Sequence, residues 1–357
     1  DRIPPLLRTA MSLERRADGV REHVAPSEAQ GEFDSVGRFY SEGAAALRPV
    51  RTGDADAAGL HVAWVIPPFI KGGGGHMIIF RMIKELERRG HSCSIWLHDP
   101  ERLEYSGEAG LRRRIKEHYV DLAAPVHSGF DNWSGADLTM ATSWQTVYPA
   151  MLLEHCGERG YLVLDHEPEF YPSSSRGVFA EQTYRLGMEC LAGSPWLADL
   201  LRTRYGAAAT PFKFGVESGE YHEDATNRRN DTVVYYARNF TERRAVELGL
   251  LALAEVVRRR PGTNVVLFGT HHRLSTEFAH EHVGVLGSDA LRRLYSEATV
   301  GLSTSLTNYS LIPSEMMACG LPVVELAGRS CESIFGADGE TIVLAEDDPS
   351  SIADAVI

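Results

Sequence analysis

Residues Leu60–Arg89, LHVAWVIPPFIKGGGGHMIIFRMIKELERR, decide the fold class. The run Leu60–Pro67 is almost wholly apolar, which is typical of a strand that is buried on both faces. From His76 to about Arg89 the apolar side chains recur every three or four residues, which predicts an amphipathic helix. A buried strand that leads through glycines into a helix predicts an α/β fold with a parallel sheet.

The same alternation continues along the chain in two series. The first series adds predicted strands at 93–97, 138–141, 161–164 and 189–192, and helices at 145–154 and 195–205. After a polar stretch, the second series predicts strands at 232–237, 264–268, 299–302 and 321–325, and helices at 242–260, 289–297 and 313–319. Consecutive parallel strands need helical crossovers. We therefore predict two doubly wound, Rossmann-like domains that face a central cleft at the carboxyl ends of their strands.

The domain boundaries follow from length and from changes in composition. The 357 residues correspond to about two domains of roughly 150 residues. We expect residues 1–58 to form a helical extension and linker, 59–215 an N-terminal domain and 216–357 a C-terminal domain. The chain does not start with Met, and a helix predicted from residue 347 has only begun when the chain stops, so we expect further residues at both ends.

Composition also excludes several classes of protein. Hydrophobic residues make up 43% and charged residues 24% of the chain, as in ordinary globular proteins. The net charge of −13 argues against a nucleic-acid partner. No run approaches the ~20 apolar residues of a membrane helix. The five scattered cysteines favour reduced, buried thiols over disulfides or a zinc site.

Four consecutive glycines, at positions 72 to 75, stand between the first predicted strand and its helix. Glycines let a ligand approach the backbone closely, and the start of a helix attracts anions. The run is not a dinucleotide fingerprint, because Met77 and Ile78 stand where glycine is needed, and no G-K-[ST] makes it a P-loop. A flexible turn is the alternative. We expect a phosphate or sugar to lie beside Gly73, Gly74 and Gly75.

Arginines gather where the second series opens. Arg238 follows the strand predicted at 232–237, and Arg243 and Arg244 fall in the first turn of the next predicted helix. Cations at a helix start oppose its dipole by about a few tenths of a kcal/mol each, so a structural purpose explains them poorly. Guanidinium groups bind diphosphates through paired hydrogen bonds. We therefore predict that Arg238, together with Arg243 or Arg244, binds a diphosphate, whereas Arg258–Arg260 fit a solvated helix end.

The segment Leu302–Val324, LSTSLTNYSLIPSEMMACGLPVV, contains the other donor-side candidates. A strand leads into a polar loop and then into a helix predicted from Pro313, which Gly320 ends. Glu315 falls in the first turn of this helix, where a carboxylate can accept hydrogen bonds from a ribose diol. A surface carboxylate that only favours the helix dipole is the alternative. We expect this segment to bind the donor through Thr307, Asn308, Tyr309, Ser310, Leu311 and Glu315.

Asp165, His166 and Glu167 follow the strand predicted at 161–164, at a carboxyl end in the first domain. Carboxylates bind sugar hydroxyls, and the neighbouring Phe170 and Tyr171 offer aromatic faces to the C–H groups of a sugar. We expect this loop to face an acceptor, with an ordinary polar loop as the alternative.

Four histidines at positions 271, 272, 280 and 282 raise the question of a metal site. An H-x-H pair alone is a weak signal, and neither a carboxylate nor a cysteine falls at a ligand spacing. We predict a solvated loop here and no metal.

The segment around Glu315 resembles the nucleotide-sugar motif of family-4 retaining glycosyltransferases with the GT-B fold, E-x7-E followed by A-M-A-C-G-x-P-V-V. Residues Val283–Ala298 resemble the stretch of that family around the donor base, and Phe214–Glu217 resembles its interdomain N-G-V-D. Two further stretches, Tyr236–Leu253 and Asp165–Pro172, are similar to patterns of the rhamnosyltransferases that assemble bacterial surface rhamnans. The resemblance implies GT-B architecture from about residue 60 onward, and its motifs are most specific in the second half.

The sequence departs from the family pattern at two places, of which the first bears on the donor sugar. The first Glu of E-x7-E is replaced by Thr307, and Arg243 or Arg244 stands for a phosphate-binding Lys of the family. In the family that Glu commonly contacts hydroxyls of the donor sugar. A donor without a 6-hydroxyl, such as rhamnose, is compatible with its loss. The resemblance makes Glu167 the first acceptor-side candidate.

By resemblance, the protein is a retaining hexosyltransferase that moves a sugar from a nucleotide-diphosphate donor to a growing glycan or lipid-linked glycan. Our interpretation of the donor is dTDP-rhamnose. Arg238, Arg243, Arg244 and Glu315 are the catalytic candidates, since the leaving diphosphate carries the developing charge. No metal or other cofactor is implied. We expect a cytoplasmic protein, with contact at the inner face of the membrane as an alternative.

Two other functions stay open. A GT-B sugar-nucleotide epimerase would convert the donor when no acceptor is present. A non-catalytic glycan-binding module would bind oligosaccharide and ignore nucleotides.

Overall fold

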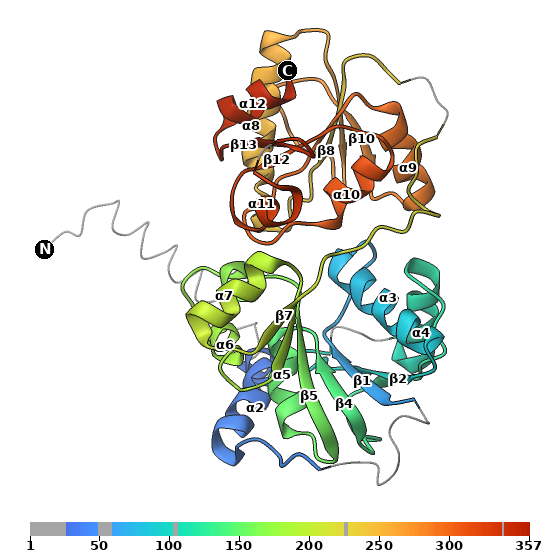
Figure 1. Ribbon diagram of the computed structural model, residues 1–357, viewed down its shortest axis with the longest axis vertical. Helices are drawn as coiled ribbons and strands as arrows, with labels where there is room; N and C mark the ends of the chain where they lie inside the picture. The colour runs from blue at the N-terminus through green and yellow to red at the C-terminus, as the bar shows by residue number, and fades with distance from the viewer. Residues whose placement is uncertain (1–25, 49–58, 103–105, 225–227, 338) are drawn as a thin grey trace, which may run out of the picture.

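The computed structural model describes residues 26–48, 59–102, 106–224, 228–337 and 339–357. These residues form two α/β units, stacked one on the other (Figure 1). The first unit contains a seven-stranded sheet of order β3-β2-β1-β4-β5-β6-β7, and the second a six-stranded sheet of order β10-β9-β8-β11-β12-β13. All of these strand pairs are parallel. The predicted architecture of two doubly wound sheets is confirmed.

The elements of the first unit lie within residues 61–211. Its strands are β1 (His61–Ile66), β2 (Ser92–Leu97), β3 (Val126–Ser128), β4 (Ala136–Ala141), β5 (Cys156–Val163), β6 (Glu189–Ala192) and β7 (Ala209–Pro211). Its helices are α3 (Gly74–Arg88), α4 (Gly107–His118), α5 (Trp144–Leu152), the 3-10 turn η1 (Glu167–Phe170), α6 (Ser175–Thr183) and α7 (Pro195–Tyr205).

The central strand β1 shows why this sequence forms a parallel sheet. Val62, Trp64 and Ile66 pack against apolar residues of α3 and α4 on one face. Ala63 and Val65 pack against residues of α5 and α7 on the other face. A strand covered by helices on both faces needs apolar side chains in both directions, which is why the sequence reads as a continuous apolar run.

The second unit repeats this plan within residues 232–356. Its strands are β8 (Thr232–Tyr236), β9 (Asn264–Phe268), β10 (Glu281–Gly284), β11 (Val300–Leu302), β12 (Val323–Leu326) and β13 (Val343–Ala345). Its helices are the 3-10 turn η2 (Glu242–Arg244), α8 (Val246–Arg259), α9 (Ser288–Glu297), α10 (Leu311–Ala318), α11 (Arg329–Phe335) and α12 (Pro349–Val356). Again the central strand is apolar on both faces, because Val233 and Tyr235 join one core cluster and Val234 the other.

Two predicted helices differ in the structure. The helix expected over 242–260 is interrupted, because Ala245 takes a left-handed φ of 43° between η2 and α8. Arg243 and Arg244 therefore precede α8, and the prediction that they lie in its first turn is wrong. The helix expected from Pro313 begins two residues earlier at Leu311, since proline is tolerated in a first turn. Glu315 consequently lies in the second turn of α10.

The structure also contains elements that the sequence pattern did not predict. Strands β3, β7, β10 and β13 have only three or four residues each, too few to show a period. Strand β10 includes His282, so the loop predicted there is wrong at this position. The other unpredicted elements are α4, η1, α6 and α11.

Helix α2 (Pro26–Glu42) docks on the first unit. Val36 is buried beside Tyr148 of α5, and the rings of Phe39 and Tyr148 meet edge to face with their centroids 5.6 Å apart. The chain beyond α2 is held by Arg159 of β5, whose Nη1 donates to the carbonyl oxygen of Ala45 at 2.9 Å. The predicted extension is thus helical at 26–42, while residues 1–25 and 49–58 lie outside the described part.

The two units touch beside the gap that separates their sheets. Helix α11 lies against α7 (Figure 1). The turn η1 lies against η2. An ion pair also joins them, because Arg81 Nη2 on α3 donates to Glu220 Oε2 on the connecting segment at 3.1 Å.

All five cysteines are buried and free, as the sequence predicts. Among the helices of the described residues, none combines the length and the apolar character that a membrane span requires. Nor do the described residues bring three or more His, Cys, Asp or Glu side chains together as a metal site.

Candidate active site

A cavity of about 840 Å³ lies between the two units. The first unit lines it with the loop after β1, the start of α3 and the residues that follow β4 and β5. The second unit contributes the residues after β8, the loop from β10 to α9 and the start of α10. The carboxyl ends of strands from both sheets therefore meet at one cavity, which is where doubly wound sheets bind ligands. Its size lies in the range of roughly 300–1,000 Å³ that is usual for ligand sites.

Two helices begin at the wall of this cavity, one from each unit. Helix α3 follows Gly73, and α10 follows Ser310. The first N–H groups of a helix have no acceptor within the helix and form the positive end of its dipole. An anion in the cavity is therefore favoured from two sides. The predicted donor residues on the wall here are Gly73, Gly74, Gly75, Tyr309, Ser310 and Leu311.

The glycine run has a specific shape. Gly72 has a φ of 79°, which disfavours any other residue, and its carbonyl oxygen accepts a 2.6 Å hydrogen bond from Arg238 of the second unit. A Cβ at Gly73 would lie 3.2 Å from the hydroxyl of Tyr119. A Cβ at Gly74 would meet nothing within 4 Å, so the space beside this residue is open.

All three predicted diphosphate arginines line the cavity. The guanidinium of Arg238 lies over the ring of Phe240, 4.5 Å from its centroid. That of Arg243 lies over Phe170 of the first unit at 4.0 Å, and its Nε is 3.0 Å from Asp165 Oδ2. Burial lowers the pKa of Arg243, as do the neighbouring arginines, whereas the Asp165 carboxylate raises it.

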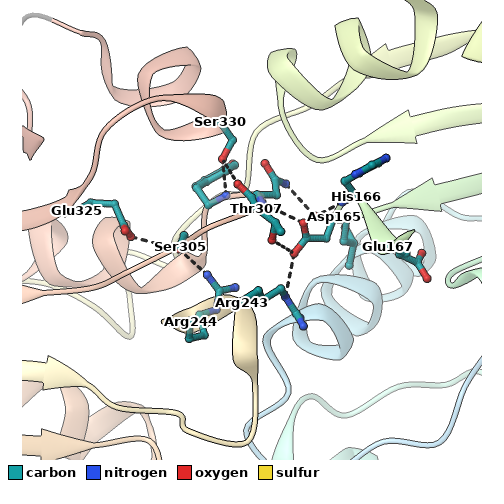
Figure 2. Close-up of polar contacts among 12 residues, drawn as sticks. Asp165, His166, Glu167, Arg243, Arg244, Ser305, Thr307, Glu325 and Ser330 are labelled. Carbon is teal, nitrogen blue, oxygen red and sulfur yellow. Dashed lines mark hydrogen bonds and ion pairs between the residues drawn. The ribbon is translucent and has the colours of Figure 1, made fainter. Parts of the chain in front are cut away.

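Arg244 is held by a carboxylate of its own unit. Its Nη1 donates to Ser305 Oγ at 2.5 Å, and Ser305 Oγ donates to Glu325 Oε2 at 3.3 Å (Figure 2). Glu325 lies in β12 and is fully buried. Burial raises the pKa of Glu325, and the N–H of Leu326 and the charge of Arg244 oppose this rise. The serine and the carboxylate together orient the Arg244 guanidinium at the cavity wall.

Asp165 contacts the second unit with both of its carboxylate oxygens (Figure 2). Oδ1 accepts hydrogen bonds from the N–H of Asn308 at 2.9 Å and from that of His166 at 2.8 Å. Oδ2 accepts the hydroxyl of Thr307 at 3.0 Å and lies 3.0 Å from Arg243 Nε. Thr307 and Asn308, predicted to bind the donor, are therefore buried where the units meet rather than on the cavity wall.

Glu315 lies on the cavity wall and is only 7% exposed, so it is not a surface carboxylate. Burial raises the pKa of Glu315 to about 7; the charge of Arg81 opposes this rise and that of Glu220 adds to it. A buried carboxylate at the edge of a cavity, with few partners of its own, is suited to accept hydrogen bonds from a polar ligand.

The remaining acceptor candidates differ from each other. Glu167 borders the cavity. Both of its carboxylate oxygens already accept hydrogen bonds within the first unit: Oε2 from the N–H of Trp144, the first residue of α5, at 2.9 Å, and Oε1 from the hydroxyl of Tyr161 at 2.6 Å. Burial raises the pKa of Glu167 to about 7. His166 is buried behind the wall, where its Nε2 lies 2.7 Å from the hydroxyl of Tyr205. Of the two, only Glu167 borders the cavity.

The second unit is similar to a known protein family. Residues 231–357 match the family model described as "WsaF, C-terminal domain". The O-antigen biosynthesis protein RfbC of Myxococcus xanthus is 32% identical to this chain over an alignment of 222 residues, and the match covers 60% of the chain. The match spans 17% of the length of that relative.

Solved structures resemble the whole two-unit arrangement. The sucrose-phosphate synthase of Thermosynechococcus elongatus superposes with a TM-score of 0.61 at 16% identity, covering 83% of this chain and 88% of that chain. Anabaena HepE in complex with UDP-glucose superposes with a TM-score of 0.60 at 14% identity, and the match covers 83% of this chain and 88% of HepE. A glycosyltransferase of Rickettsia africae superposes with a TM-score of 0.59 at 14% identity, and the match covers 84% of this chain and 87% of that enzyme. The fold is GT-B.

Several residues of this GT-B cleft escaped the sequence analysis. Tyr236, Arg81 and Glu220 line the cavity, and Ser305 and Glu325 support Arg244. Of these residues, Glu325 could have been found from the sequence. It is a carboxylate in an otherwise apolar strand, and buried carboxylates are rare unless they are paired. Arg81, Glu220 and Ser305 pair with residues far away in the sequence, so no local spacing reveals them.

Proposed function

We propose that this protein is a glycosyltransferase that takes a sugar from a nucleoside diphosphate and adds it to a glycan of a bacterial surface polysaccharide. The observation that carries the proposal is the convergence of Arg238, Arg243 and Arg244 on the cavity between the two GT-B units. The names of the relatives support it, since RfbC acts in O-antigen biosynthesis and HepE was solved with UDP-glucose.

The chemistry follows from where negative charge develops. When the bond between the sugar and the diphosphate breaks, the leaving phosphate gains charge, and cations fixed before the reaction stabilise it. In the proposal the three arginines and the first N–H groups of α3 and α10 provide this stabilisation. The wall residues Tyr309, Ser310 and Leu311 belong to this donor side, and Glu315 accepts hydrogen bonds from the ribose hydroxyls. The departing phosphate oxygen takes the proton of the acceptor hydroxyl, and retention follows from attack on the same face.

The roles of the two units divide in the same way. We assign donor binding to the second unit, 216–357, and acceptor binding to the first, 59–215. The acceptor approaches the donor beside Gly73, Gly74 and Gly75, with Glu167 at the border of the cavity. In the proposal the units close over the bound donor and exclude water, which limits hydrolysis of the donor.

We further propose L-rhamnose, carried by dTDP, as the donor sugar. The support is the side chain at position 307, where a threonine hydroxyl faces Asp165 and not the cavity. A sugar that lacks the 6-hydroxyl requires one polar partner fewer than glucose does.

A binding panel tests the proposed function. The panel contains UDP, dTDP, GDP and ADP, their monophosphates and their sugar derivatives, each measured by the shift in melting temperature. A nucleoside diphosphate present at 100 times its Kd stabilises the folded protein by about 2.7 kcal/mol. The account predicts such a shift for one or two diphosphates and a much smaller shift for the monophosphates. Equal, null responses to all of them would contradict it.

Product analysis then separates transfer from the two alternative functions. A transferase consumes the sugar nucleotide fast only when an acceptor glycan is added. An epimerase changes the sugar nucleotide without any acceptor, and a glycan-binding module leaves it unchanged under both conditions.

A further inference from the structure

We propose that Asp165 is a positioning residue that competes with the donor's diphosphate for Arg243, so that nucleotide binding is coupled to the contact between the units. The proposal rests on the proposed function, because it takes the diphosphate to be the ligand of Arg243. It assigns Asp165 a role between the units in place of the acceptor role predicted from the sequence.

The first support is the set of partners of Asp165. Its carboxylate is buried, with 7% of the residue exposed, at the carboxyl end of β5. Two of its three hydrogen-bond donors come from the second unit, the N–H of Asn308 and the hydroxyl of Thr307, and Arg243 of the same unit adds an ion pair, with its Nε 3.0 Å from Oδ2. A second bond nearby, from Asn308 Nδ2 to the carbonyl oxygen of Leu164 at 2.8 Å, ties the same loop to the first unit. Both carboxylate oxygens thus already accept hydrogen bonds from the protein itself.

The second support is the geometry of Arg243. Asp165 lies against its Nε, while Arg243 also lines the cavity with 28% of its side chain exposed. A guanidinium carries five N–H donors, so its terminal amino groups can turn to a phosphate. Two anions near one cation repel each other, and a cavity of low dielectric strengthens this repulsion. The Asp165 charge therefore weakens the hold of Arg243 on a diphosphate.

The contacts of Asp165 divide into two kinds. The bonds to Thr307 and Asn308 hold the loop before α10 against β5 and do not require Arg243. The ion pair with Arg243 is exchangeable, since a diphosphate offers the same guanidinium another anion. After transfer, the returning Asp165–Arg243 pair favours release of the nucleoside diphosphate.

The variant Asp165→Asn separates these two kinds of contact. The amide oxygen can still accept the N–H groups of Asn308 and His166, and the amide nitrogen can donate to the Thr307 hydroxyl. Only the attraction to Arg243 is lost. We predict that this variant binds the nucleoside diphosphate about tenfold more tightly than the wild type at low salt, with a smaller gain at high salt. Turnover at saturating donor falls, because the product leaves more slowly.

Three controls make the result specific, with binding of UDP and dTDP measured by titration calorimetry. Asp199→Asn, the same change on an exposed residue of α7, leaves the affinity unchanged. In an Arg243→Gln background, Asp165→Asn has no effect, because the competition passes through Arg243. Thr307→Val acts in the opposite direction: Asp165 loses one donor, holds Arg243 more strongly, and the diphosphate binds more weakly.

The outcomes decide between the two proposals. If the wild type binds a diphosphate but Asp165→Asn binds it equally or less tightly, this inference is wrong and the proposed function stands. If Asp165→Asn does not fold, an unchanged affinity in Thr307→Val overturns the inference instead. If the wild type binds no nucleotide of the panel, the proposed function and this inference are both overturned.

Discussion

Each of the two adjacent arginines at the cavity has a carboxylate of its own, and the two carboxylates come from different units. Arg244 reaches Glu325 of the same unit through Ser305, so its position does not depend on how the units are placed. Arg243 faces Asp165 of the other unit. The position of Arg244 is therefore fixed within its own unit, whereas the contact of Arg243 depends on where the neighbouring unit lies.

Arg238 gives the first prediction at the scale of the residue. It adds a positive charge to the cavity and donates across it to Gly72. We expect Arg238→Ala to abolish the thermal stabilisation by a nucleoside diphosphate and to lower kcat/KM by about 10²-fold or more, the usual loss when a fixed donor to a developing charge is removed. Arg258→Ala, on the exposed end of α8, is the matched control and keeps both properties.

Glu315 predicts how nucleotide binding depends on pH. Burial raises its pKa to about 7, so the carboxyl is half protonated near neutral pH. A carboxylate accepts hydrogen bonds from ribose hydroxyls better than the protonated acid does, so the affinity rises as the pH increases from 6 to 8. Glu315→Gln shows only the pH dependence of the phosphates themselves. If the nucleotide affinity of the wild type and that of Glu315→Gln change with pH in the same way, Glu315 does not bind the ribose.

Glu167 predicts how stability depends on pH. Burial raises its pKa from 4.5 to about 7 in the folded protein. Between these values the folded state binds more protons than the unfolded chain, so this group makes the protein less stable as the pH rises from about 4.5 to 7. The slope is at most about 1.4 kcal/mol per pH unit for one group. Urea unfolding at pH 5 and at pH 7.5 should show a smaller difference for Glu167→Gln than for the wild type.

At the scale of the element, the break between η2 and α8 gives a further prediction. Ala245 holds a φ of 43°, where a side chain costs about 1 kcal/mol and glycine has no such cost. We expect Ala245→Gly to raise the free energy of unfolding by about 0.5–1 kcal/mol. Ala254→Gly, inside α8, should lower it by about 1 kcal/mol. If Ala245→Gly destabilises the protein as much as Ala254→Gly does, the two arginines lie in a continuous helix after all.

The elements also show how far the sequence alone leads. Long apolar runs and amphipathic helices were predicted within a few residues, as for β1 and α3, because a strand or helix covered by neighbours must carry its pattern throughout. The break at Ala245 could not be predicted, because no glycine or proline marks it in the sequence. Short edge strands such as β13 form because a neighbouring strand offers hydrogen bonds, and their three residues carry no period of their own.

The candidate site was predicted in part for the same reason. Arg238, Arg243, Arg244, Glu315 and the glycines were found because each belongs to a local motif at the end of a strand. The partner of Thr307 lies 142 positions away at Asp165, and the pair formed by Arg81 and Glu220 is separated by 139 positions. Only the folded arrangement of the two units brings such residues together.

At the scale of the whole molecule, the site exists only where the two units face each other. The cavity takes its walls from both, and the contacts across it involve Asp165, Arg238 and Arg81. Any change in the angle between the units therefore alters the spacing of the charges that surround the ligand. The account predicts that a nucleoside diphosphate protects the backbone of both units from hydrogen exchange at the glycine run and at the loop before α10. Protection confined to one unit would show that the ligand does not bridge them.

The most direct measurement is the structure of this protein with a bound nucleoside diphosphate. The account predicts that the phosphates lie between the starts of α3 and α10, within hydrogen-bonding distance of Arg238, Arg243 and Arg244. A diphosphate bound elsewhere on the protein, with these three guanidinium groups turned away from it, would contradict the central claim.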